Sequence, residues 1–124
     1  MISEYISNEQ AVGQSCHASS VAVIADGRCL ATWFSGTHEK NPDVVIKLAV
    51  RTEERGWAEP FTVAAVRSAD GDPVAHWNPV LFVHAGVVTL YFKVGATIDI
   101  WRQYQMSVPE SADDFSDLSA WTSP

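Results

Sequence analysis

The sequence predicts an all-β protein made of two similar units, each with four antiparallel strands. Three observations predict this class. Residues 16–36 and 75–95 resemble each other at a constant offset of 59, with a histidine, a valine and two glycines in common. Short runs of β-branched and aromatic residues alternate with turn signals such as Asp26-Gly27. No window of a dozen residues shows a convincing helical period.

The predicted strands follow one another at residues 20–24, 29–34, 44–50, 61–65, 80–83, 87–93 and 98–106. The first and fifth of these contain apolar residues at consecutive positions, which predicts strands that are covered on both faces by stacked sheets. Residues 113–120 are a weak helix candidate, because the segment is short and acidic.

The length of 124 residues fits one domain. Within it we expect a first unit at 16–66 and a second at 75–124, whose tail diverges after Met106. We expect residues 1–15 to form an N-terminal latch strand. Each unit ends on a Trp-x-x-Pro frame, at 57–60 and 121–124. Four-stranded units that repeat every 40 to 60 residues or so are typical of β-propeller blades.

Charge and hydropathy exclude two classes of partner. Fifteen acidic and eight scattered basic residues give a net charge of -7, which disfavours capture of a nucleic-acid backbone. No stretch approaches the roughly 18 apolar residues of a membrane helix, and the N-terminus lacks the basic start of a signal peptide. We therefore expect a cytoplasmic protein without nucleic-acid or membrane partners, and we expect no cofactor or metal.

Several motifs together resemble the opening of the bacterial sialidase-like (neuraminidase-like, BNR-repeat) proteins. They are EYI at 4–6, SCHAS at 15–19, WFSGTHE at 33–39, PDV at 42–44, HWNPVLF at 76–82 and YFKVG at 91–95. The resemblance implies a six-bladed β-propeller that acts on glycans or binds them over its central channel. It covers roughly residues 3–106, which correspond to two of the six blades.

The candidate site lies where the inner strands begin and where the second strand of each blade connects to the third, because these points share one face of a propeller. Glycoside cleavage needs two acid/base or nucleophilic groups, and Glu39 and Asp43 are the candidate catalytic carboxylates. A solvated loop position is the alternative for both. The candidate ligand-binding residues are His17, His38, His76, Trp77, Asn78 and Lys93.

These ligand-binding residues also have structural alternatives. A histidine that begins a buried strand often satisfies backbone groups, and a tryptophan in a small β-protein often packs in the core. Sialidases hold the substrate carboxylate with three arginines from different blades. Matched positions of this chain do not supply three such arginines, so we do not expect sialidase activity from an isolated subunit.

Two blades leave one apolar sheet face open on each side, and such faces favour association. Because the two faces differ, head-to-tail joining can close a ring, and we expect a homotrimer of six blades, with a dimer as the alternative. Three functions remain open on the sequence. They are a non-catalytic glycan-binding or remnant protein, a sialidase-type hydrolase assembled from several subunits, and a structural oligomer without a ligand.

Overall fold

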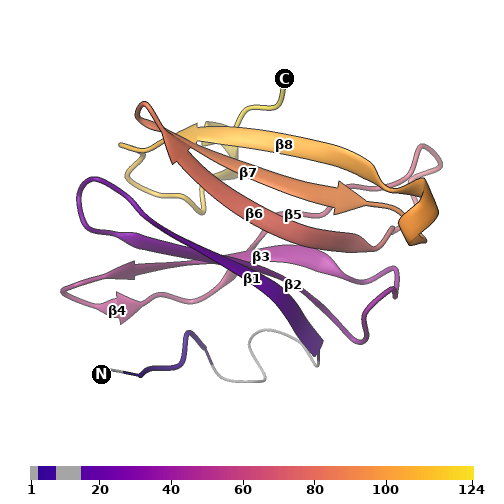
Figure 1. Ribbon diagram of the computed structural model, residues 1–124, viewed down its shortest axis with the longest axis horizontal. Coiled ribbons are helices and arrows are strands. Elements are labelled where there is room, and N and C mark those ends of the chain that lie inside the picture. The colour runs from indigo at the N-terminus through magenta and orange to yellow at the C-terminus, as the bar shows by residue number, and fades with distance from the viewer. Residues whose placement is uncertain (1–2, 8–14) are drawn as a thin grey trace.

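The computed structural model describes residues 3–7 and 15–124, and its strands form two antiparallel sheets (Figure 1). The first sheet contains β1 (Ser15–Val23), β2 (Cys29–Gly36), β3 (Val45–Thr52), β4 (Gly56–Trp57) and β5 (Phe61–Ala64), and the second contains β6 (His76–His84), β7 (Val87–Val94) and β8 (Arg102–Pro109). Helical structure in this part of the chain is limited to two 3₁₀ turns, η1 (Ile98–Ile100) and η2 (Leu118–Ala120). The all-β prediction is therefore confirmed.

The first sheet has the architecture of a propeller blade. Its strands pair in the order β1-β2-β3, and β4 and β5 both pair with the remaining edge of β3. Glycine allows the tight turn before β2, where Gly27 has a φ of 93°. A short fourth strand broken into two pieces thus replaces the single outer strand that we predicted.

The second sheet has three strands, in the order β6-β7-β8, where four were predicted. The position of the fourth strand is occupied by a single bridge between Ser107 and Thr122, with two backbone hydrogen bonds of 2.8 Å. The segment 113–120 forms only the one turn of η2, because its apolar side chains have no helical period.

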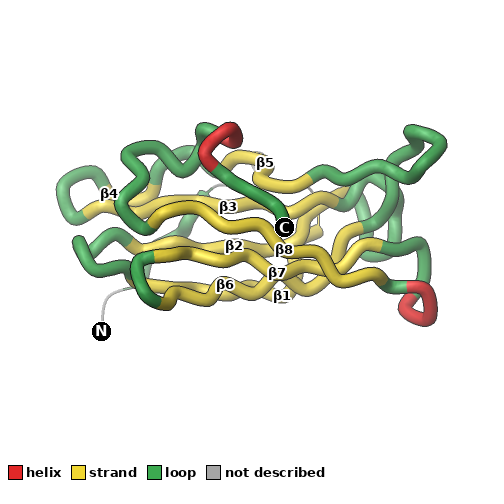
Figure 2. Tube along the Cα trace, turned by 90° about the horizontal axis from the view of Figure 1, so that it is seen from above, coloured by secondary structure: helices red, strands yellow, loops and turns green. Residues whose placement is uncertain are grey.

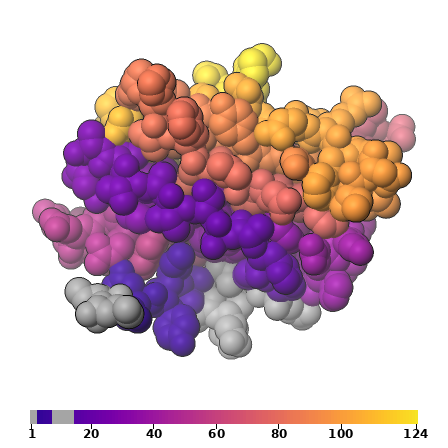
Figure 3. All heavy atoms as spheres, in the orientation of Figure 1, coloured from indigo at the N-terminus to yellow at the C-terminus, as the bar shows by residue number. Residues whose placement is uncertain are grey.

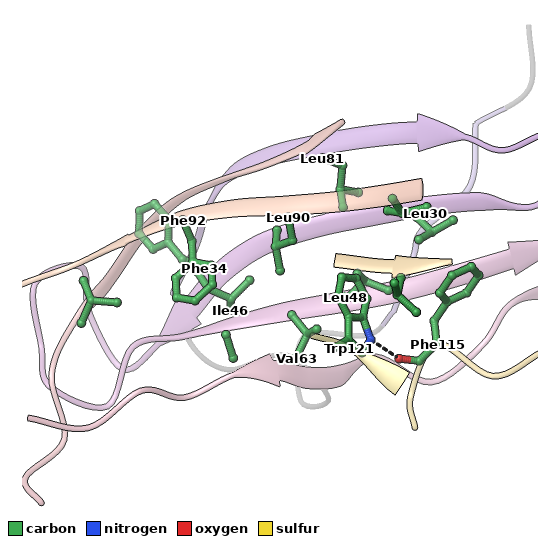
Figure 4. Close-up of a cluster of buried hydrophobic side chains, with 14 of the residues drawn as sticks. Leu30, Phe34, Ile46, Leu48, Val63, Leu81, Leu90, Phe92, Phe115 and Trp121 are labelled. Atoms are coloured by element: carbon green, nitrogen blue, oxygen red, sulfur yellow. Dashed lines mark hydrogen bonds between the residues drawn. The ribbon is translucent and has the colours of Figure 1, made fainter. Parts of the chain in front are cut away.

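The two sheets stack face to face and enclose the core (Figures 1, 3 and 4). Leu30, Leu48 and Leu90 contribute fully buried side chains from the two sheets. The tail after Met106 also enters this core. Trp121 donates a hydrogen bond of 2.9 Å from Nε1 to the backbone oxygen of Phe115, and both side chains are buried (Figure 4). The divergent tail is therefore part of the domain.

Seen from above, the strands of both layers run along the same long direction, and the loops gather at the two ends (Figure 2). Arg28 fixes the tail at one end, because its guanidinium donates to the backbone oxygens of Ala112 and Glu110 and lies 4.7 Å from the ring centroid of Phe115. No helix of the described residues is long and apolar enough to cross a membrane.

Residues 3–7 form no strand and lie on the face of the first sheet that is turned away from the second (Figure 1). Ile6 packs there against Ala31, Trp33 and Ala49, and Glu4 forms an ion pair with Arg51. The rest of the predicted latch strand, at 1–2 and 8–14, lies outside the described residues. Addition of this segment to another blade stays a prediction.

Candidate functional site

The inner strands and the connections named from the sequence meet at one end of the molecule, which we call the strand-start end. It contains the first residues of β1 and β6, the β2–β3 connection at 37–44 and the β7–β8 connection at 95–101 (Figure 1). The backbone N–H of His76 donates to the oxygen of Val44 over 3.2 Å, which ties the start of the second blade to the loop of the first.

Glycines let each connection fold back against its strand. A Cβ on Gly36 would lie 2.8 Å from Asp43 Oδ1 and 2.9 Å from the Cα of Val44, and a Cβ on Gly95 would lie 3.0 Å from the oxygen of Ile100. These glycines occupy corresponding places in the two blades. The repeat thus preserves a close backbone approach that a larger residue would prevent.

Aromatic rings form a continuous row across both blades at this end. The centroids are 5.4 Å apart for His17 and Phe34, 6.2 Å for Phe34 and Trp77, and 5.3 Å for Trp77 and Trp101. Lys93 completes the row, since its Nζ lies 4.6 Å from the centroid of Trp101. We call these five residues the aromatic row. It contains three of the predicted ligand-binding residues, together with Phe34 and Trp101.

The members of the aromatic row differ in accessibility. Trp77 is 3% exposed and donates from Nε1 to the oxygen of Gly95 over 2.8 Å, so it is a buried member of the row. His17 is exposed, and its Nε2 lies 2.8 Å from the hydroxyl of Ser15. Trp101 and Lys93 are half-buried. The accessible groups are therefore His17 at one end and the Trp101–Lys93 pair at the other.

A bulge at the start of each inner strand shapes the surface beside the row. The register shifts between His17 and Ser20 in β1 and between Trp77 and Val80 in β6. Asn78 lies within the second bulge with a φ of 43° and an exposed side chain. Asparagine tolerates this left-handed backbone better than most residues. The bulge thus directs an amide into solvent next to buried Trp77.

The two repeated histidines do not occupy equivalent positions. His17 stands opposite Phe34, whereas the counterpart of Phe34 in the second blade, Lys93, stands opposite Trp77. Trp77 therefore takes the structural place of His17, and His76 lies one position before it in β6. The side chain of His76 is 1% exposed. The offset of 59 therefore describes the sequence repeat well but places this pair one residue out of structural register.

His76 has the structural role that was the alternative to ligand binding. Its Nδ1 lies 2.8 Å from the oxygen of Val74, and its Nε2 accepts a hydrogen bond of 2.9 Å from the N–H of Val66. Its ring also stacks on Phe92, with centroids 5.8 Å apart. Burial lowers the pKa of His76 below its usual value. Both ring nitrogens are used inside the protein, so His76 offers nothing to a ligand.

The candidate carboxylates belong to the β2–β3 connection. Asp43 is exposed, and its two oxygens lie 3.3 and 3.2 Å from the N–H of Thr37, which closes the loop. Glu39 is half-buried, and its backbone oxygen lies 2.8 Å from Nδ1 of exposed His38. Asp99, in the other connection, accepts a hydrogen bond from the Thr97 hydroxyl that lowers its pKa.

Arginines are spread over the molecule and do not converge on these carboxylates. Arg28 binds the tail, Arg51 pairs with Glu4, and Arg67 donates to the oxygen of Gly71 over 3.0 Å. Arg102 begins β8 at the strand-start end and is exposed. Arg67 also lines a pocket with Asp43. The described part of one subunit thus places Arg67 and Arg102 toward the strand-start end, where a carboxylate clamp of the sialidase type needs three arginines.

Two residues of the candidate site were not predicted from the sequence. Phe34 and Trp101 were not among the predicted ligand-binding residues, although they link the histidine and lysine ends of the aromatic row. The signal for Trp101 was its place at the end of the β7–β8 connection, which the topology puts at the strand-start end. The indole Nε1 of Trp101 is buried and has no hydrogen-bond partner among the described residues.

Comparison with known proteins agrees with the fold and the motifs. The family model described as the BNR repeat-like domain matches residues 27–124, from the turn before β2 to the end of the chain. No curated protein and no solved structure matches the chain. The matched region includes β2–β8 and all of the aromatic row except His17. The chain therefore belongs to the BNR repeat-like family of sialidase-like proteins.

Proposed function

We propose that the protein is a non-catalytic glycan-binding member of this family and that it works as a homo-oligomer. The observation that carries the proposal is the aromatic row, which runs across both blades and brings accessible polar groups to its two ends. His17, Asn78 and Lys93 offer hydrogen-bond donors and acceptors of the kind that fix a sugar over an apolar surface.

Binding fits the site better than hydrolysis for two reasons. Asp43 accepts the backbone N–H of Thr37 and so holds its own loop, which is a structural use of the carboxylate. The sialidase reaction also depends on an arginine clamp, and Arg28 and Arg51 bind groups outside the strand-start end. Glu39 remains the one candidate for an acid in an assembled hydrolase.

Exposed apolar side chains on the outer face of each sheet support the oligomer. In the first sheet, Val21 and Val23 are 60% and 66% exposed. In the second, Val80 and Phe82 are 51% and 53% exposed. The two faces differ in shape and composition, so their contact is heterologous and can close into a ring. Three copies would supply six blades, and a dimer is the alternative assembly.

A glycan array that includes sialosides tests the binding function. We expect wild-type protein to bind, and we expect His17→Ala and Asn78→Gly to weaken binding, because each removes one accessible polar group. The glycine at position 78 keeps the left-handed backbone free of strain. His84→Ala is the matched control, since His84 is an exposed histidine at the other end of β6. Equal loss in the control, or absence of binding by wild type, would contradict the proposal.

Hydrolysis of a fluorogenic sialoside separates binding from catalysis. We expect wild type and Glu39→Gln to be equally inactive, because Asp43, the other candidate carboxylate, holds its own loop through the N–H of Thr37. Turnover by wild type that Glu39→Gln abolishes would favour the assembled hydrolase. Absence of both turnover and glycan binding would leave a structural oligomer.

A further inference from the structure

Two turns of the chain share the sequence Ala-Asp-Gly and the same backbone structure. We call them the first Ala-Asp-Gly turn, at 24–28, and the second, at 68–72. In each turn the N–H of the first residue donates to the oxygen of the fifth over 2.9 Å. The glycine N–H donates to the oxygen of the first residue, over 3.0 Å in the first turn and 2.9 Å in the second. Gly27 and Gly71 have φ angles of 93° and 85°, which makes both segments three-residue turns that end on a left-handed glycine.

An aspartate that precedes a glycine can rearrange its own backbone. The amide nitrogen of the glycine attacks Cγ of the aspartate, and as the N–Cγ bond forms, the neutral carboxyl group releases its hydroxyl with the amide proton as water. The product is a five-membered cyclic imide. Water that adds to the main-chain carbonyl carbon breaks the original peptide bond, so the chain continues through Cβ and Cγ as isoaspartate. Water that adds to Cγ restores aspartate, and the overall reaction needs no co-reactant.

The two Ala-Asp-Gly turns are equally open to this reaction. Asp26 and Asp70 are both exposed. A Cβ placed on Gly27 or on Gly71 would meet no atom within 4 Å, so neither glycine nitrogen is crowded. Glycine also adds no side chain that would hinder the attack. Any difference in reactivity must therefore come from what holds each carboxylate and each turn.

Arg28 holds both carboxylate oxygens of Asp26. Its backbone N–H donates to Oδ1 over 3.0 Å, and its Nε donates to Oδ2 over 2.8 Å. The carboxylate is thus bound to residue 28, and attack by the nitrogen of Gly27 requires both bonds to break. Hydrogen bonding from the backbone of Arg28, and then from its side chain, lowers the pKa of Asp26. Because an ionised carboxylate has no hydroxyl to release as water, this ionisation also disfavours the reaction.

The second turn lacks this clamp. The residue in the place of Arg28 is Asp72, whose backbone N–H donates to the Ser68 hydroxyl over 3.2 Å instead. Arg67 donates to the oxygen of Gly71 over 3.0 Å and not to a carboxylate. Within residues 3–7 and 15–124, no hydrogen bond or ion pair holds the Asp70 side chain. Its carboxyl group is therefore free to turn toward the next nitrogen.

The second turn also opens at lower cost. The first turn closes the long β1–β2 hairpin, and the N–H of Ala25 donates to the carboxylate of Glu110. The second turn is closed by a single bridge, between Arg67 and Pro73. Attack by the glycine nitrogen requires the turn to leave its hydrogen-bonded geometry, and local opening is easier where fewer backbone bonds hold a segment.

We propose that Asp70 is a site of spontaneous isoaspartate formation and that Arg28 protects Asp26 from the same reaction. The modification would insert Cβ of Asp70 into the main chain of the β5–β6 connection, residues 65–75. This connection lies at the strand-start end, where Arg67 and Asp43 line one pocket (Figure 1). The change would lengthen the link between the two blades and disrupt the hydrogen bonds of the second turn. The inference does not depend on glycan binding.

Storage of the intact protein at about pH 5, where ordinary aspartates are partly neutral, tests the proposal. Trypsin then releases residues 1–28 and 68–93, each with one Asp-Gly pair. Electron-transfer fragmentation of these peptides distinguishes isoaspartate from aspartate. We expect isoaspartate to form at least about tenfold faster at Asp70 than at Asp26, because Asp26 must first lose a charge-assisted hydrogen bond.

Substitutions at position 72 test the missing clamp. Asp72→Arg supplies the guanidinium that the first turn has, and Asp72→Ala is the matched control that removes the same carboxylate. We expect isoaspartate at Asp70 to form about threefold more slowly in Asp72→Arg than in Asp72→Ala, as one exposed ion pair implies. Asp72 itself precedes Pro73, whose nitrogen carries no proton, so it cannot form the imide by this route.

Synthetic peptides of residues 1–28 and 68–93 separate the effect of the fold from that of the neighbouring residues. We expect the rates at the two Asp-Gly pairs to converge in these peptides. Three results would overturn the proposal. They are isoaspartate that is absent at Asp70 or equally fast at Asp26 in the intact protein, equal rates in Asp72→Arg and Asp72→Ala, and a tenfold difference that persists in the peptides.

Discussion

Replacement of His76 by alanine tests the structural role that its surroundings assign to it. The substitution leaves the half-buried N–H of Val66 without its acceptor, which costs about 1–3 kcal/mol. It also removes the stacking on Phe92, which contributes about 0.5–1.5 kcal/mol. With the cavity that remains, we expect a loss of about 2–5 kcal/mol in the free energy of unfolding. Urea denaturation at pH 8, followed by tryptophan fluorescence, measures this loss.

The pH dependence of stability gives the same prediction a second readout. The folded pKa of His76 is lowered by burial from an unfolded value of 6.5, so between these two values the unfolded state binds the extra proton. The contribution of neutral His76 is complete above pH 6.5 and is lost as the pH falls toward the folded pKa. We expect His76→Ala to flatten this acid-side decline, whereas the exposed control His84→Ala keeps it. A His76→Ala protein that loses less than about 1 kcal/mol, or that declines like wild type, would refute the reasoning.

Three other substitutions test parts of the fold. Urea denaturation measures the effect of the first two, and limited proteolysis measures the effect of the third. Trp121→Ala should cost about 3–5 kcal/mol, because it empties a core position and leaves the Phe115 oxygen unpaired; a loss near zero would show that the tail is not part of the core. Gly36→Ala should destabilise the protein by about 1–3 kcal/mol, since the new methyl group would meet Asp43 at 2.8 Å, and unchanged stability would argue against that close approach. Arg28→Ala should speed proteolysis after residue 109, because two backbone oxygens of the tail lose their donor; wild-type cleavage rates would contradict this.

The fold class could be predicted from the sequence because strand-length runs and turn signals reflect local preferences that the structure keeps. The consecutive apolar residues at 21–24 and 80–83 also predicted the stacked sheets. The prediction that these strands are covered on both faces was wrong for the subunit, because Val21, Val23, Val80 and Phe82 are more than half exposed. The offset could not reveal that His76 lies one position from the place of His17, because the whole inner strand is shifted by one residue at its turn. Val23 pairs with Cys29 in the first blade, whereas Val83 pairs with Val88 in the second, and the equivalent bulges leave this shift unchanged. Turn length sets the cross-strand register, which a linear comparison does not contain.

The burial of the tail after Met106 could not be predicted from the sequence. Phe115 and Trp121 are isolated apolar residues in an acidic segment, so neither a helical period nor a run of apolar residues predicted that they enter the core. Their burial depends on long-range contacts, namely the Ser107–Thr122 bridge and Arg28 over the ring of Phe115. The sequence did predict that the two inner strands and two connections converge. It could not predict which of the converging side chains become accessible, because Trp77 and His76 are covered by rings from other strands.

The most direct measurement of the proposed site is a titration of ¹⁵N-labelled protein with sialyllactose, followed by amide and indole chemical shifts. We predict saturable shifts at the backbone amides of His17 and Asn78 and at the indole N–H of Trp101, with little change at His84. Shifts confined to the opposite end of the sheets, or no shifts at millimolar ligand, would contradict a glycan site on the aromatic row.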